Sequence, residues 1–172
     1  MDKLFYLTPS LCLAVAIWVL SRRYVVFTLL QLPGTLCHEL AHFLTGLLTL
    51  ARPVSMSIVP RREGKGYRLG EVQLANASWY NSALTALAPM LLVLIPWWIA
   101  VLRTRGAWHF TPLDAGLAFL IAPQFLACWP SAADWKLAMR SWPLAIIAGA
   151  GWYVWMTYPG LHSWLSWHWP AA

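Results

Sequence analysis

Long apolar stretches alternate with short polar segments along the chain. The apolar stretches run at about residues 4–20, 24–50, 81–102, 113–129 and 143–158. A helix that crosses the hydrocarbon core of a bilayer needs about 20 mostly apolar residues, and these stretches meet or approach that length. The pattern predicts an all-α integral membrane bundle of about five transmembrane helices.

The segment at about residues 53–77 has a different pattern. Apolar residues alternate with serines from Val54 to Ile58, and apolar residues recur from Tyr67 to Val72 after a polar, glycine-containing turn. Alternation with period 2 around such a turn predicts a β-hairpin. We therefore expect one membrane-embedded domain over residues 1–172, with its core at about 24–140 and the hairpin between the second and third spans.

Composition and charge support a membrane protein. Hydrophobic residues make up 60% of the chain and charged residues only 10%, whereas soluble domains carry about a quarter charged residues. The net charge of +6 comes from short basic clusters between the apolar stretches, as in the loops of membrane proteins, so no nucleic-acid partner is expected.

The basic residues also predict an orientation. Five alternating spans place Lys3 and the basic residues of the hairpin on one face, and Arg22, Arg23, Arg103 and Arg105 on the other. The first face carries the larger number, and basic residues are enriched in cytoplasmic loops. The N-terminus and the hairpin are therefore expected in the cytoplasm.

One short motif carries the candidate chemistry, His38-Glu39-Leu40-Ala41-His42 in the second stretch. Glu39 alone among the six acidic residues lies deep in an apolar stretch. A charged residue at the centre of a membrane helix costs about 2.5–3.5 kcal/mol on insertion scales, so its presence indicates a functional site. Histidines four residues apart lie on one helix face, where both can bind one metal ion. This is the HExxH pattern of zinc hydrolases.

Zinc is the expected cofactor, because it takes three protein ligands and leaves a position open for water. The metal would lower the pKa of that water and polarise a scissile carbonyl, while Glu39 would act as the general base. The alternative is a chance grouping of polar side chains packed inside a helical bundle. Two histidines and a glutamate at this spacing in a membrane segment favour the metal site.

The third metal ligand must come from another element, and two aspartates compete for the role. Asp134 lies about 9 Å before the boundary at Arg140, and His42 lies about 15 Å before the boundary at Arg52, at 1.5 Å per residue. The similar depth favours Asp134. Asp114 lies near the start of the fourth stretch, where helix capping is the favoured role. A capping or surface role for Asp134 also stays open.

The motif resembles a known family. Gly34-Thr35-Leu36-Cys37-His38-Glu39-Leu40-Ala41-His42 on a membrane helix is similar to the site-2 protease clan of intramembrane metalloproteases, the M50 peptidases. The string Pro130-Ser131-Ala132-Ala133-Asp134 resembles the position of the family's aspartate ligand. The family's longer signature, Asn-x-x-Pro followed by Leu-Asp-Gly, is absent in that form. Pro112-Leu113-Asp114-Ala115-Gly116 is partly similar to its end, which keeps Asp114 as the second choice.

The resemblance covers about Tyr24 to Arg140. It implies zinc bound by His38, His42 and Asp134, with Glu39 as the general base. It also implies cleavage of a membrane-embedded or membrane-proximal substrate, most simply a single-span membrane protein, in a bacterial plasma membrane. Two other functions stay open: a membrane protein that binds or transports zinc without proteolysis, and a catalytically silent membrane scaffold.

Overall fold

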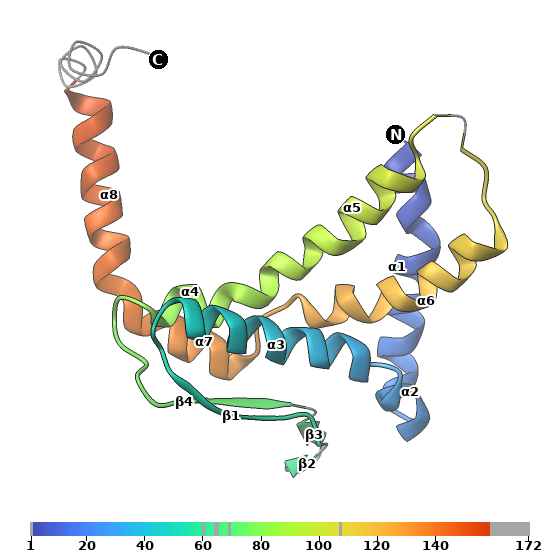
Figure 1. Cartoon of the computed structure of the whole chain (residues 1–172), viewed down its shortest axis with the longest axis horizontal. Helices are drawn as coiled ribbons and strands as arrows, with labels where there is room; N and C mark the ends of the chain where they lie inside the picture. Colours follow the sequence, from blue (N-terminus) through green and yellow to red (C-terminus); the bar gives the residue numbers. More distant parts are fainter. Residues whose placement is uncertain (1, 60, 64–65, 69, 107, 159–172) are drawn as a thin grey trace.

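The computed structural model describes residues 2–59, 61–63, 66–68, 70–106 and 108–158. This part of the chain is mostly helical, as predicted (Figure 1). The helices are α1 (Asp2–Ser21), α2 (Val25–Leu29), α3 (Leu32–Leu48), α4 (Ser82–Leu87), η1 (Ala88–Val93), α5 (Leu94–Arg103), α6 (Pro112–Ala127), α7 (Ala132–Ala138), η2 (Met139–Ser141) and α8 (Trp142–Thr157). The strands are β1 (Pro53–Ser57), β2 (Arg61–Glu63), β3 (Gly66–Arg68) and β4 (Glu71–Leu74).

Two helical segments of the described residues are long and apolar enough to cross a membrane, Asp2–Ser21 and Ser82–Arg103. A third candidate is the pair Pro112–Ala127 and Ala132–Thr157, bent by 54°, if the pair is one span. These segments indicate a multi-pass membrane protein, as the hydropathy pattern predicts. The predicted count of about five is matched only in part, with two or three candidate spans.

The helix that carries the HExxH motif is shorter than the apolar stretch around it. The predicted second span is divided between α2 and α3, and α3 has 17 residues, about 25 Å at 1.5 Å per residue. Pro33 lies in the first turn of α3, where a missing N–H costs no helical hydrogen bond. The break therefore precedes Pro33, and α3 ends before Leu50, whose φ of 60° is the left-handed conformation that often closes a helix.

Glycines allow α3 to lie very close to its neighbours. A Cβ added at Gly34 would overlap the carbonyl oxygen of Pro123 and lie 3.0 Å from the Cβ of Ala127, so α3 and α6 are in backbone contact. A Cβ added at Gly46 would lie 3.6 Å from Cγ2 of Thr85 in α4. The two histidines of the motif lie between these glycines, on a helix held closely between α6 and α4.

The predicted β-hairpin is confirmed. β1 pairs antiparallel with β4, and β2 pairs antiparallel with β3. The alternating apolar side chains do not form a buried face, since Val54 is 69% exposed and Met56 is 38% exposed. Both outer strands contact α3, so the hairpin lies along the helix that carries the HExxH motif (Figure 1).

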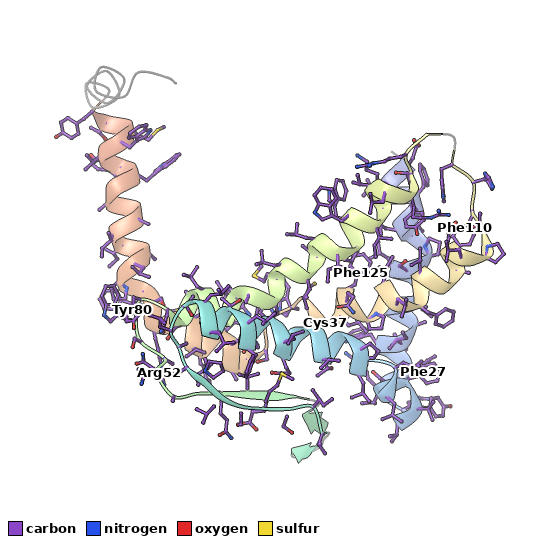
Figure 2. All side chains as sticks on the ribbon, in the orientation of Figure 1. Phe27, Cys37, Arg52, Tyr80, Phe110 and Phe125 are labelled. Atoms are coloured by element: carbon purple, nitrogen blue, oxygen red, sulfur yellow. The ribbon has the colours of Figure 1, made fainter. Side chains whose placement is uncertain are left out.

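The apolar core lies where α1, α5 and α6 meet. Phe125 of α6 packs against both of its clusters (Figure 2). The first cluster is Tyr6, Leu7, Ala100 and Ile121, and the second is Ala14, Ile17 and Ala122. α8 contributes no residue to either cluster, and it extends away from the other helices (Figure 1). A helix that is apolar all round and unburied within the chain suits a lipid environment.

One part of the predicted arrangement is wrong. Tyr6 lies 5.5 Å from Trp108 between ring centroids, and Nζ of Lys3 lies 5.5 Å from the ring centroid of Trp97. The start of α1 and the end of α5 therefore share one end of the molecule, although the prediction placed Lys3 and Arg103 on opposite faces. The prediction assumed five alternating spans, whereas α2 and α3 do not form one long helix between α1 and α4.

Candidate metal centre

Three side chains converge from two separate parts of the chain. Nε2 of His38 lies 3.1 Å from Nε2 of His42. The carboxylate of Asp134 lies 3.4 Å from Nε2 of His38 and 3.1 Å from Nε2 of His42. Among the described residues, these three form the one group of His, Cys, Asp or Glu side chains that could hold a metal ion. They are the three ligands that the sequence favoured.

A hydrogen bond at Nδ1 of each imidazole, the ring nitrogen that faces away from the centre, determines the tautomer. Nδ1 of His38 lies 2.6 Å from the carbonyl oxygen of Ala127, and Nδ1 of His42 lies 2.7 Å from the carbonyl oxygen of Thr85. A carbonyl oxygen only accepts, so both Nδ1 atoms must carry the proton and donate it. In the neutral rings, both Nε2 atoms then present lone pairs. Histidine ligands of metals are commonly oriented by such hydrogen bonds.

The convergence of these acceptors requires a positive charge among them. Two Nε2 lone pairs and a carboxylate repel one another at 3.1–3.4 Å unless a proton or a metal ion lies between them. A tetrahedral zinc site with bonds of about 2.0–2.2 Å has donor atoms about 3.3–3.6 Å apart. The spacing and the chemistry of the donors therefore suit a small divalent cation.

Asp134 is held at the start of α7 by a capping box. Oδ2 of Asp134 accepts the backbone N–H of Ser131 at 2.6 Å, and the Oγ of Ser131 accepts the N–H of Asp134 at 3.2 Å. The capping role and the ligand role were predicted as alternatives. The structure is compatible with both, because a carboxylate has enough lone pairs to accept the backbone N–H and also to bind a cation lying between it and the two imidazoles.

Asp114 lies in a different environment, outside this three-residue group. It is fully buried and accepts two hydrogen bonds from Arg103, at 2.8 Å from Nε and 3.1 Å from Nη2. It also accepts the backbone N–H of Thr111 at 2.8 Å, which completes a capping box at the start of α6. The predicted capping role is correct, although Thr111 rather than Asp114 is the N-cap residue, because Pro112 occupies the first helical position.

Glu39 is buried and lines the same cleft as the three-residue group. The cleft has a volume of about 720 Å³ and is bounded by α3, α7, the end of α6 and β4. A Cβ added at Gly70 would overlap the side chain of Glu39. The backbone just before β4 therefore lies directly against this carboxylate, a contact that the sequence did not predict.

The asparagines of the loop before α4 have structural roles. The side chain of Asn81 is buried and donates to the carbonyl oxygens of Thr49 and Asn76, at 3.3 Å and 3.0 Å. The side chain of Asn76 donates to the carbonyl oxygen of Leu50 at 3.0 Å. These contacts fasten the loop to the end of α3, and neither asparagine lines the cleft.

No protein-family model matches this chain, and no curated protein or solved structure matches it. The geometry nevertheless defines a class: a multi-pass, mostly helical membrane protein with a candidate centre of two histidines and one aspartate.

Proposed function

We propose that this chain is a zinc-dependent intramembrane endopeptidase. One observation supports it above the others: two imidazoles and a carboxylate converge within hydrogen-bonding distance in a cleft that also contains Glu39. Three protein ligands and one open position are typical of catalytic zinc. HExxH supplies two of the ligands and the adjacent glutamate of a zinc hydrolase.

The chain's own residues supply binding, orientation and proton transfer. Zinc, when bound, provides a Lewis acid that polarises a carbonyl and lowers the pKa of water toward neutrality. His38, His42 and Asp134 would hold the ion, and the single negative charge of Asp134 would leave the centre cationic. Glu39 takes a proton from the attacking water and returns it to the departing amide nitrogen.

The proposal extends to the family resemblance. We propose a minimal, divergent relative of the site-2 proteases, in which Asp134 supplies the third ligand from the first turn of α7. The support is the position of Asp134 against both histidines. Asp114, the other aspartate considered, forms an ion pair with Arg103 instead.

The hairpin offers a means of holding an extended substrate. Helical substrates hide their peptide bonds, so a segment must unwind before hydrolysis. Among the strands that the structure describes, β4 pairs with β1 alone, and its residues Glu71, Val72 and Leu74 line the cleft. An extended segment added at the free edge of β4 would lie beside the centre. β4, rather than β1, is the strand that lines the cleft.

The contact between α1 and α5 also supports a proposed orientation. If Asp2–Ser21 and Ser82–Arg103 are both spans, their contacting ends share one face, and Ser21 and Ser82 share the other. Between Ser21 and Ser82 the chain carries seven basic residues, Arg22, Arg23, Arg52, Arg61, Arg62, Lys65 and Arg68. The opposite face carries Lys3, Arg103 and Arg105. Basic residues are enriched on the cytoplasmic side, so we place the hairpin in the cytoplasm and the N-terminus outside, in a bacterial plasma membrane.

The deciding experiment measures bound zinc and peptide-bond cleavage in the purified protein. Glu39→Gln should retain zinc, and its cleavage rate should fall about 10²–10⁴-fold, the usual contribution of a general base. Asp2→Asn is the control, since Asp2 is an exposed carboxylate outside the cleft. A panel of single-span membrane proteins serves as substrates. Zinc retention with no cleavage of the panel by the wild type would indicate zinc binding or transport, and absence of zinc would indicate a scaffold.

A further inference from the structure

The two histidines of the centre are oriented by backbone carbonyls that have lost their usual helical partners. In an α-helix each carbonyl oxygen accepts the N–H four residues later. For Ala127 that donor would be Ser131, but the N–H of Ser131 is given to Asp134 at 2.6 Å. The oxygen of Ala127 instead lies 2.6 Å from Nδ1 of His38.

The second carbonyl is released in a different way. The oxygen of Thr85 would accept the N–H of residue 89, but residue 89 is proline and has no N–H. The α-helix ends at Leu87, and a 3₁₀ segment begins at Ala88 with the proline in its first turn. The oxygen of Thr85 lies 2.7 Å from Nδ1 of His42. Thr85 and Pro89 are both fully buried, so water does not compete for this oxygen.

We infer that Pro89 is a positioning residue of the metal centre. Its missing N–H reserves the carbonyl of Thr85 for His42, and this hydrogen bond holds Nε2 toward His38 and Asp134. An N–H at position 89 would compete with His42 for the same oxygen. The inference rests on the proposed metal centre, and it adds a residue that touches neither the metal nor the substrate.

The test compares three replacements of buried prolines by zinc and cobalt binding to the full-length protein. Pro89→Ala restores the N–H. Lactic acid at position 89, the hydroxy-acid analogue of alanine, removes the proline ring but still supplies no N–H. Pro96→Ala is the matched control, because Pro96 is also fully buried and lies in the same helical segment, away from the histidines.

Pro89→Ala should raise the dissociation constant for zinc about 10–100-fold, the usual effect of losing a hydrogen bond to a metal-bound histidine. It should also shift the visible absorption bands of the cobalt-substituted protein, which report ligand geometry. The lactic acid variant and Pro96→Ala should bind zinc within about threefold of the wild type. Neither variant adds an N–H that competes for the carbonyl oxygen of Thr85, so both keep its hydrogen bond with His42.

Each outcome has one interpretation. Zinc affinity that is equal in Pro89→Ala and the wild type would overturn the inference and leave the proposed function intact. Equal weakening by alanine and lactic acid would also overturn it, because the ring or the bend would then be the cause. A wild type that binds no zinc would instead refute the proposed function. Should Pro89→Ala fail to fold, the lactic acid variant still tests the inference. It must keep the wild-type affinity for zinc, and weaker zinc binding by this variant would overturn the inference.

Discussion

At the scale of single residues, the same side chain acquires two different roles through its partners. Asp114 and Asp134 both occupy the third position of a helix and both complete a capping box. Asp114 has a guanidinium within 2.8 Å, which neutralises it. Asp134 has two imidazoles that present acceptor nitrogens, so its charge stays available for a cation.

The two aspartates therefore predict opposite effects of the same substitution. Asp134→Asn should weaken zinc binding at least about tenfold, because an amide is a poor ligand, with a smaller effect on thermal stability. Asp114→Asn should leave zinc affinity unchanged and lower the melting temperature by about 5–10 °C, because Arg103 loses its counter-ion. Zinc titration and thermal unfolding of both variants check this. The assignment of roles fails if Asp114→Asn weakens zinc binding while Asp134→Asn does not.

Gly70 predicts a separate effect on the general base. A Cβ at this position would overlap the carboxylate of Glu39, so Gly70→Ala must displace either that side chain or the backbone before β4. The cleavage rate should fall at least about tenfold, which is part of the roughly 10²–10⁴-fold that a general base contributes, and bound zinc should remain. Gly149→Ala is the control, since a Cβ at Gly149 would meet no atom within 4 Å. Full activity in Gly70→Ala would contradict this contact.

The sequence predicted the residues of the candidate centre better than their surroundings. His38 and His42 follow from helical spacing, and Glu39 from the cost of a charge among apolar residues. The carbonyls of Ala127 and Thr85 could not be predicted in the same way, because every residue has a carbonyl and only the fold determines which one is released. Pro89 and the Ser131–Asp134 turn were the available signals, since each removes a particular N–H donor.

At the scale of elements, close packing of α3 determines the position of the centre. Gly34 and His38 are four residues apart, so they share a face of α3 and both meet the end of α6. Gly34 meets the backbone of Pro123, and His38 meets the carbonyl of Ala127. The distance between the helices and the orientation of the histidine are therefore coupled.

Gly34→Ala should separate α3 from α6 and weaken the centre. Overpacking of this kind typically costs about 1–3 kcal/mol of stability, and zinc affinity should fall with it because the His38–Ala127 hydrogen bond lengthens. Gly116→Ala on α6 is the matched control, since a Cβ there would meet no atom within 4 Å. It should stabilise the helix by about 0.5–1 kcal/mol. Thermal unfolding and zinc titration of both variants test this prediction. Unchanged zinc affinity in Gly34→Ala would refute the coupling between the α3–α6 distance and the orientation of His38.

The free edge of β4 predicts an effect on substrate affinity. Successive residues of a strand direct their N–H groups to opposite edges, so either Val72→Pro or Gln73→Pro removes a donor from the edge next to the cleft. That variant should raise KM about 3–10-fold, since one hydrogen bond contributes about 0.5–1.5 kcal/mol, with bound zinc unchanged. Steady-state cleavage kinetics measure it. If neither variant changes KM, the substrate does not add to this edge.

The elements themselves were predicted unevenly. The hairpin followed from alternation and a turn, and its pairing is as expected. The division of the 24–50 stretch into α2 and α3 begins before Pro33, because a proline in the first turn of a helix costs no helical hydrogen bond. The alternation of β1 predicted the strand but gave no information on burial, and Val54 is exposed.

At the scale of the whole molecule, the contact between the ends of two candidate spans bears on the proposed topology. The rings of Tyr6 and Trp108 lie 5.5 Å apart, whereas the hydrocarbon core of a bilayer is about 30 Å thick. Two groups in contact cannot lie on opposite faces. Sequence reasoning could not reach this result, because hydropathy gives the number of apolar stretches and not which of them complete a crossing.

The topology is tested with single cysteines in a background that lacks Cys12, Cys37 and Cys128. Asp2→Cys and Gly106→Cys should both react with a membrane-impermeant thiol reagent added outside intact cells, because both lie at the end shared by α1 and α5. Ser57→Cys, on β1 of the hairpin, should react only after the cells are opened. Retained zinc binding in each variant shows that the fold is preserved. Labelling of position 2 on the same face as position 57 would restore the arrangement with alternating spans, and it would contradict the packing of α1 against α5 in the native membrane.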